Sequence, residues 1–204
     1  MKNLFLRSGA ALACALSLAA CGGGNANLYL AGTVYGLTKP GLVIKNGNMS
    51  TTVDGNSTGA ATSFSFTELL KSDENFDVEP FPPDGTVCTS LYNKGKTGAY
   101  SITNIQITCH NIPQELSGVI NGLTGTGLIL NNGPTQVKIA PGGSPLKFSF
   151  AVKDSAGAIT SGAVGQGEPF GVTVLQQPSG QTCTVANGTG VMAKGYDGVI
   201  VTCQ

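Results

Sequence analysis

The stretch LAGTVYGLTKPGLVIKNG, residues 30–47, returns later in the chain as LSGVINGLTGTGLILNNG, residues 116–133. The two copies align without a gap and agree at nine of eighteen positions. Further matches follow in the same order along both halves: FSF at 64–66 and 148–150, and FDV at 76–78 against FGV at 170–172. Self-similarity of this kind indicates that the chain contains two copies of one structural module.

The boundary between the copies is expected in the segment HNIPQE, residues 110–115. Proline cannot donate a hydrogen bond to a β-ladder, so Pro113 is expected to end the last strand of the first copy. We therefore place module 1 at residues 28–111 and module 2 at residues 112–204. Each segment is long enough to form a small domain of its own.

Alternating apolar residues in both copies are typical of strands that bury one face. The sets expected to share a face are Ile105, Ile107 and Cys109; Phe148, Phe150 and Val152; Phe170, Val172 and Val174; and Val199, Val201 and Cys203. Asn-Gly, Asp-Gly and Pro-x-Gly turn signals separate these runs. About seven short strands per copy predict an all-β fold made of two tandem antiparallel β-sandwiches.

The order of motifs within each copy resembles a repeat found in exported bacterial proteins and lipoproteins. The run G-x-V-x-G-L is followed by F-x-F, F-x-V-x-V, P-x-G-x-x-C and a final V-T-C. The modules are similar to immunoglobulin-like and prealbumin-like (carboxypeptidase-regulatory or Cna-B type) sandwiches. This resemblance covers nearly all of residues 28–204 and implies a module type without implying an activity.

The N-terminus has the organisation of an export signal. Lys2 and Arg7 precede the 13-residue apolar run SGAALACALSLAA, which is shorter than the roughly 20 residues of a membrane-spanning helix. The run ends in Leu18-Ala19-Ala20-Cys21, which resembles the lipobox of bacterial lipoproteins. This resemblance implies that residues 1–20 are removed as a signal peptide and that Cys21 is acylated. An ordinary secretory signal cut after Ala20 is the alternative.

The lipobox also implies where the mature protein resides. Gly22, rather than aspartate, follows the acylated cysteine, and in proteobacterial lipoproteins this implies transfer to the outer membrane. The three acyl chains of such lipoproteins imply stable anchoring, because a single chain binds membranes only reversibly. Residues 21–27 then form the lipidated cysteine and its tether, and six residues reach at most roughly 20 Å. We therefore expect module 1 to lie close to the membrane surface.

Four of the six cysteines remain once Cys14 leaves with the signal and Cys21 is acylated. Four cysteines allow three pairings, and the repeat selects the one in which both modules form the same bond. The predicted disulfides are Cys88–Cys109 and Cys183–Cys203. The oxidising compartments of exported proteins favour such bonds, and closing a loop of about 20 residues should stabilise each module by roughly 3 kcal/mol.

We expect no metal site, no cofactor and no catalytic residue. Neither cysteine pair has zinc-site spacing, and the single histidine, His110, directly follows Cys109, so the two side chains should lie on opposite strand faces. We expect His110 to be a solvated residue of the linker. The acidic stretch of module 1 consists of Glu68, Asp73, Glu74, Asp77 and Glu79. It allows three interpretations: a calcium site, a carboxylate pair of a glycosidase, or a solvated loop. Because module 2 keeps only Glu168 near the matching place, the solvated loop is favoured over the calcium site and the carboxylate pair.

The composition narrows the class of function. The formal net charge is zero and 11% of residues are charged, which argues against nucleic acid as a partner. We therefore predict a non-enzymatic, outer-membrane-anchored lipoprotein that acts as a structural spacer or interaction module of the cell envelope. Its expected partners are the membrane, through Cys21, and other envelope proteins or a surface ligand. An adhesin-like surface lipoprotein that binds a glycan or another ligand is the alternative, although the absence of tryptophan weighs against stacking on sugars.

Overall fold

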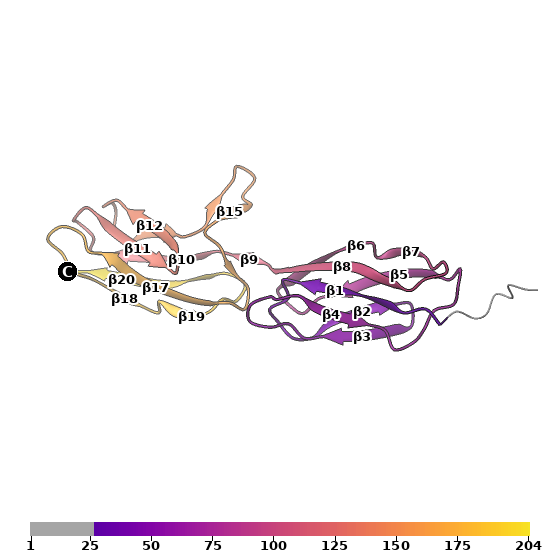
Figure 1. The fold of residues 1–204 in the computed structure, drawn as a ribbon. Helices are drawn as coiled ribbons and strands as arrows, with labels where there is room; N and C mark the ends of the chain where they lie inside the picture. Colours follow the sequence, from indigo (N-terminus) through magenta and orange to yellow (C-terminus); the bar gives the residue numbers. More distant parts are fainter. Residues whose placement is uncertain (1–26) are drawn as a thin grey trace, which may run out of the picture.

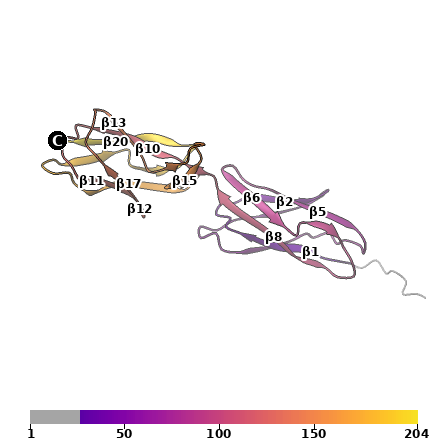
Figure 2. The same cartoon turned by 90° about the horizontal axis from the view of Figure 1, so that it is seen from above.

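The computed structural model describes residues 27–204, which fold into two elongated β-modules arranged end to end (Figure 1). The described chain begins at one end of the molecule and the C-terminus lies at the other. A view turned by 90° shows the same arrangement (Figure 2). Every regular element in residues 27–204 is a β-strand, so the predicted all-β class of tandem sandwiches is confirmed.

Module 1 consists of two four-stranded sheets. Its strands are β1 (Leu30–Tyr35), β2 (Leu42–Asn46), β3 (Met49–Val53), β4 (Thr62–Ser65), β5 (Asn75–Phe81), β6 (Thr86–Leu91), β7 (Lys94–Lys96) and β8 (Ile102–Asn111). One sheet has the order β4-β1-β8-β6 and the other the order β3-β2-β5-β7. The apolar faces of the two sheets enclose the core of the module.

Module 2 repeats this topology. Its equivalent strands are β10 (Leu116–Asn121), β11 (Leu128–Asn132), β12 (Thr135–Ile139), β13 (Leu146–Ser149), β17 (Pro169–Gln176), β18 (Cys183–Ala186), β19 (Thr189–Val191) and β20 (Tyr196–Cys203). The sheet orders are β13-β10-β20-β18 and β12-β11-β17-β19. Strand for strand these are the orders of module 1, as the sequence repeat requires.

One strand pair in each module departs from the expected antiparallel pattern. The first and last strands, β1 with β8 and β10 with β20, run parallel at the centre of their sheet. The remaining paired strands are antiparallel. Alternation of apolar residues shows that a strand buries one face, but it does not reveal the direction of the neighbouring strand.

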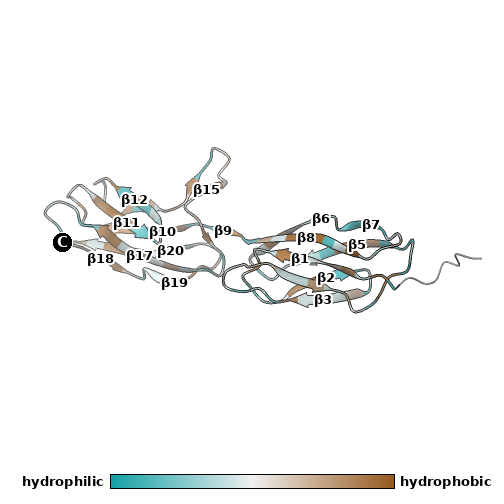
Figure 3. Ribbon diagram, viewed as in Figure 1, coloured by the Kyte–Doolittle hydropathy of each residue, from teal (hydrophilic) through white to brown (hydrophobic). Residues whose placement is uncertain are grey.

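The buried faces lie where the alternation predicts them, with one exception. Ile105, Ile107, Val199 and Val201 are each at most 1% exposed, and the apolar residues follow the strands of both modules (Figure 3). Val152 is 57% exposed. The expected face ends before it because β13 ends at Ser149 and the chain leaves the sheet.

Module 2 differs from module 1 in the connection that follows its fourth strand. In module 1 this connection covers residues 66–74, whereas in module 2 it covers residues 150–168. The longer connection contains β14 (Val152–Lys153), β15 (Ile159–Ser161) and β16 (Val164–Gly165). The β14–β15 hairpin projects from the module (Figure 1). Strand β16 pairs with the linker strand β9 (Pro113–Gln114).

Candidate functional site

The four cysteines form the two predicted disulfides. Cys88 bonds Cys109, and Cys183 bonds Cys203, with Cα–Cα distances of 4.1 and 4.0 Å. In each module the bonded residues are directly opposite partners in an antiparallel ladder, between β6 and β8 or between β18 and β20. Each disulfide therefore ties an edge strand to the last strand of its module, which makes it a structural bond.

The Pro-x-Gly turns before the first cysteine of each pair have different surroundings. In module 1 the turn contains Asp84 and Gly85, and it faces module 2. The equivalent turn of module 2 contains Ser179 and Gly180, and Ser179 N–H donates to the carbonyl of Thr126 in the same module. Only the first turn is thus part of the contact between the modules that we call the junction.

Gln166 is the central side chain of the junction and is 8% exposed. Its Nε2 donates to Asp84 Oδ2 of module 1 at 3.1 Å, and its Oε1 accepts from Gln114 Nε2 at 3.3 Å. Its backbone N–H donates to the carbonyl of Ile112 in the linker at 2.9 Å. One residue of the longer connection in module 2, residues 150–168, which we call the insertion, therefore bonds both the linker and module 1.

Asn111 forms a second set of bonds across the junction. Its Nδ2 donates to Glu168 Oε1 of module 2 at 3.0 Å and to Thr38 Oγ1 at 2.9 Å. Its Oδ1 accepts from Thr86 Oγ1 at 3.2 Å. The other carboxylate oxygen of Glu168 accepts from Gly165 N–H at 3.2 Å. Asn111 and Glu168 thus fix the end of β8 against the insertion.

Two glycines of the junction also lie closely against side chains of the other module. A Cβ on Gly85 would lie 2.5 Å from Gln166 Cδ, and a Cβ on Gly167 would lie 2.7 Å from Lys39 Cε. Lys39 Nζ donates to the carbonyl of Asp84 at 2.9 Å. The ion pair of Lys194 with Asp84, at 3.8 Å, has side chains 76% and 81% exposed and should contribute little. Hydrogen bonds from the side-chain amides of Gln166 and Asn111 to the carboxylates of Asp84 and Glu168, rather than this exposed ion pair, hold the junction.

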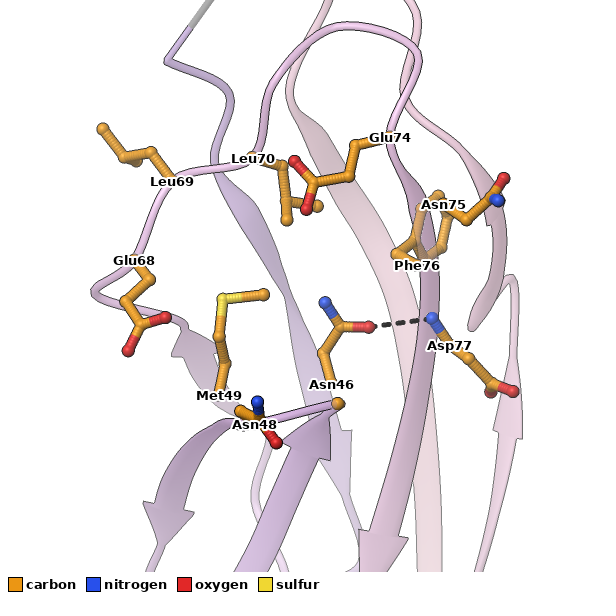
Figure 4. A pocket seen from close by; sticks show the side chains of 11 residues that line it. Asn46, Asn48, Met49, Glu68, Leu69, Leu70, Glu74, Asn75, Phe76 and Asp77 are labelled. Carbon is orange, nitrogen blue, oxygen red and sulfur yellow. Dashed lines mark hydrogen bonds between the residues drawn. The ribbon is translucent and has the colours of Figure 1, made fainter.

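The acidic stretch of module 1 borders a cleft of about 480 Å³ at the end remote from the junction (Figure 4). Glu68, Glu74 and Asp77 line this cleft. Glu74 Oε2 accepts from Lys71 N–H at 2.8 Å, and Asp77 Oδ2 pairs with Lys94 Nζ at 2.9 Å. The bond to Asp77 raises the pKa of the Lys94 ammonium. The carboxylates of Glu74 and Asp77 are therefore engaged in local bonds within the module.

The other two acids of the stretch do not line the cleft. Asp73 pairs with Lys96 at 3.6 Å, and Glu79 lies opposite Lys45 in the ladder between β2 and β5. Across residues 27–204, no three His, Cys, Asp or Glu side chains gather as a metal-binding group. The arrangement is that of a charged, hydrogen-bonded loop and sheet edge.

The single histidine does not lie in the linker. His110 belongs to β8, opposite Val87, and is exposed, whereas its neighbour Cys109 is buried. The linker expectation was wrong because β8 continues to Asn111. Cys21, the predicted lipidation site, lies outside the described residues. Within those residues, no helix is long and apolar enough to cross a membrane.

Sequence reasoning missed the junction, although the repeat contained a signal for it. The two copies differ in polarity where module 1 meets module 2. Asp84 stands where module 2 has Ser179, and Lys39 where it has Gly125. At these two positions, the charge that only module 1 carries coincides with the surface that meets module 2.

Comparison with known proteins gives distant similarities. No family model and no curated protein matches the chain. The Bacillus anthracis TIE protein is 15% identical with a TM-score of 0.39, over 85% of this chain and 32% of that one. The major pilin T-13 of Streptococcus pyogenes serotype GAS131465 is 8% identical with a TM-score of 0.34, over 86% and 96%. The major pilin T3.2 of serotype GAS13637 is 11% identical with a TM-score of 0.33, over 88% and 97%.

Proposed function

We propose that the protein is a non-enzymatic lipoprotein of the bacterial envelope, anchored in the outer membrane through Cys21. Its two modules act as a structural spacer that holds an interaction surface away from the membrane. The observation that carries this proposal is the junction, in which Gln166 is buried and bonded to Asp84, Gln114 and the linker backbone.

A spacer needs a fixed length, and the junction supplies a physical reason for one. Relative motion is the default for domains joined by a linker. Here, bending would break the bonds of Gln166 and Asn111, and a buried polar group left without a partner costs about 1–3 kcal/mol. The end-to-end arrangement also puts the start of module 1 and the C-terminus at opposite ends (Figure 1).

The location of the protein is supported by two separate features. Disulfides persist in oxidising compartments and are rare in the cytosol, so Cys88–Cys109 and Cys183–Cys203 favour an exported protein. The sequence Leu18-Ala19-Ala20-Cys21 favours a lipid anchor. Labelling cells with radioactive palmitate tests the anchor: the wild-type protein should carry label and a Cys21→Ala variant should not.

The spacer is tested by measuring the distance between two spin labels. Ser50→Cys in β3 and Gln136→Cys in β12 put labels on exposed, equivalent positions of the two modules, in a Cys21→Ser background with the disulfides oxidised. We expect one narrow distance distribution. Adding Gln166→Ala and Asn111→Ala should broaden it, because these changes remove the side-chain bonds across the junction.

The matched control is Gln181→Ala. This glutamine also makes several side-chain hydrogen bonds, but all of them lie within module 2 at the end remote from the junction. Its distribution should stay narrow. A broad distribution in the protein without junction substitutions would refute the spacer.

Crosslinking in intact envelopes, followed by purification, separates a spacer with envelope-protein partners from the adhesive alternative.

A further inference from the structure

The end of module 1 remote from the junction is formed by three segments that are bonded to one another. These are residues 28–29, the loop 66–74 and the loop 97–101, which we call the tip. Leu28 and Leu70 exchange two backbone hydrogen bonds of 2.9 Å. Tyr29 N–H donates to Ser101 Oγ at 2.9 Å. The three segments therefore form one surface.

Thr97 fixes the two loops of the tip to each other. It is 1% exposed, and its backbone N–H donates to the carbonyl of Glu74 at 2.8 Å. Its hydroxyl accepts from Glu74 N–H at 2.9 Å and donates to the carbonyl of Lys71 at 2.5 Å. The tip is thus held in a defined shape by buried bonds.

Each segment of the tip carries a large, exposed side chain with apolar character. Tyr29 is 57% exposed, Leu69 is 40% exposed and Tyr100 is 83% exposed. Leu70 is 2% exposed, whereas Leu69, at the border of the cleft, extends outward from its loop (Figure 4). A single exposed apolar residue needs no explanation, but here one comes from each of three adjoining segments. Tyrosine, with its apolar ring and polar hydroxyl, is enriched at membrane–water interfaces.

The position of the anchor makes a bilayer the surface that faces the tip. The six residues after Cys21 reach at most roughly 20 Å, and they lead directly to Leu28 at the tip. The tip carries the acids Glu68, Asp73 and Glu74 and the cation Lys71, and Asp73 pairs with Lys96 of the adjoining strand β7 at 3.6 Å. This acidic excess offers no attraction to anionic lipid, so the surface suits a zwitterionic phospholipid layer.

We propose that the tip docks on the phospholipid bilayer, with Tyr29, Leu69 and Tyr100 entering the interfacial region. This inference rests on the proposed anchor at Cys21 and adds a second membrane contact to it. The acyl chains hold the protein to the membrane, and the tip sets its orientation. The long axis of the two modules then points away from the bilayer, and module 2 lies farther from the bilayer than module 1.

Fluorescence tests this contact, because the protein has no tryptophan. In the chain from Cys21 to Gln204 with both disulfides oxidised, Cys21 is the sole free thiol and can be coupled to maleimide phospholipid in phosphatidylcholine vesicles. Tyr100→Trp then places the single indole at the tip. Its emission should shift to shorter wavelength, and brominated phosphatidylcholine should quench it several-fold more than in the control.

The control is Leu175→Trp, at a position 52% exposed on β17 of module 2. Adding Tyr29→Ser and Leu69→Ser to the Tyr100→Trp chain should reduce quenching, and raising the salt concentration should not. Quenching of Tyr100→Trp no stronger than that of Leu175→Trp would overturn the docking proposal. Because the coupling is chemical, that result would leave the anchor untouched, and palmitate labelling tests the anchor separately.

Discussion

Gly118→Ala should destabilise module 2 strongly, because Gly118 lies where β10 meets its parallel neighbour β20. The register of this pair shifts between Leu116 and Gly118. A Cβ on Gly118 would lie 2.1 Å from the carbonyl oxygen of Val199. This oxygen belongs to the backbone of a central strand, so no side-chain rotation can relieve the overlap.

The size of the effect follows from the cost of overpacking. Adding a group to a packed core costs about 1–3 kcal/mol and occasionally more, and a backbone clash should reach the upper end. A shift of about 4–8 °C per kcal/mol for a domain of this size then predicts that module 2 melts roughly 12–24 °C lower. A module of about 90 residues has only about 5–13 kcal/mol of stability, so the loss is a large fraction of the total.

Differential scanning calorimetry with the disulfides intact measures this shift, and hydrogen exchange identifies which module unfolds. Gly171→Ala is the matched control in the same module: nothing lies within 4 Å of the added Cβ. That substitution should be neutral or stabilise by about 0.4–1 kcal/mol. Gly32→Ala, whose Cβ would lie 2.3 Å from the carbonyl of Ile105, should instead destabilise module 1. If Gly118→Ala melted together with Gly171→Ala, the close-approach argument would be wrong.

Three further perturbations test single contacts. Replacing Cys183 and Cys203 together by serine should cost module 2 about 3 kcal/mol, measured by urea unfolding; an unchanged midpoint would show that the bond is not structural. The Lys153 ammonium bonded to Glu115 holds the pKa of that carboxyl below its usual value. The contribution of this pair to the stability of the folded state is therefore complete above the unfolded pKa of about 4.3, and it is lost as the pH falls through the lower folded pKa. The protection factors of the β14–β15 hairpin amides, which correct for the slower intrinsic exchange in acid, should therefore fall as the pH is lowered, and Glu115→Gln should abolish this pH dependence. Thr97→Val leaves Glu74 N–H without its buried acceptor and should destabilise the tip by about 1–3 kcal/mol, which is measured as faster amide hydrogen exchange in the tip. Protection equal to that of the wild type would show that Thr97 does not fix the two loops to each other.

The sequence predicted the features that are repeated and local. The disulfides followed from the repeat because equivalent modules form equivalent bonds. The buried faces followed from alternation, as in Ile105 and Ile107. Even some identical polar positions have structural reasons: Asn46 Oδ1 accepts from Asp77 N–H at 2.8 Å, and Asn132 makes the same type of bond to Gly171 N–H at 2.7 Å.

The features that the sequence did not predict depend on contacts between distant segments. The parallel pairing of β1 with β8 joins the two ends of a module, and no local pattern encodes strand direction across such a distance. The junction depends on Gln166, which belongs to the connection 150–168, and this connection is longer than its counterpart 66–74 in module 1. Because a repeat comparison weighs only the matching positions, it leaves an inserted segment uninterpreted.

The two Pro-x-Gly turns show how one module design serves two positions in the chain. In both modules, the side chain of a glutamine forms hydrogen bonds with the loops at the end where the turn lies. In module 1, Gln166 comes from the neighbouring module and bonds Asp84. In module 2, Gln181 comes from the turn itself: its Oε1 accepts from Thr124 and Gly125 N–H at 2.7 Å each, and its Nε2 donates to the carbonyl of Gly122 at 2.8 Å.

The residue in module 1 that corresponds to Gln181 is Thr86, which bonds Asn111 at the junction. The inner end is therefore built to receive a neighbouring module, and the outer end satisfies its own backbone groups. A third module docked on the outer end in the same way would find Ser179 in place of Asp84 and Gly125 in place of Lys39. It would thus lack the carboxylate that Gln166 uses at the junction. The outer end of module 2 therefore does not repeat the polar contacts by which module 1 receives its neighbour.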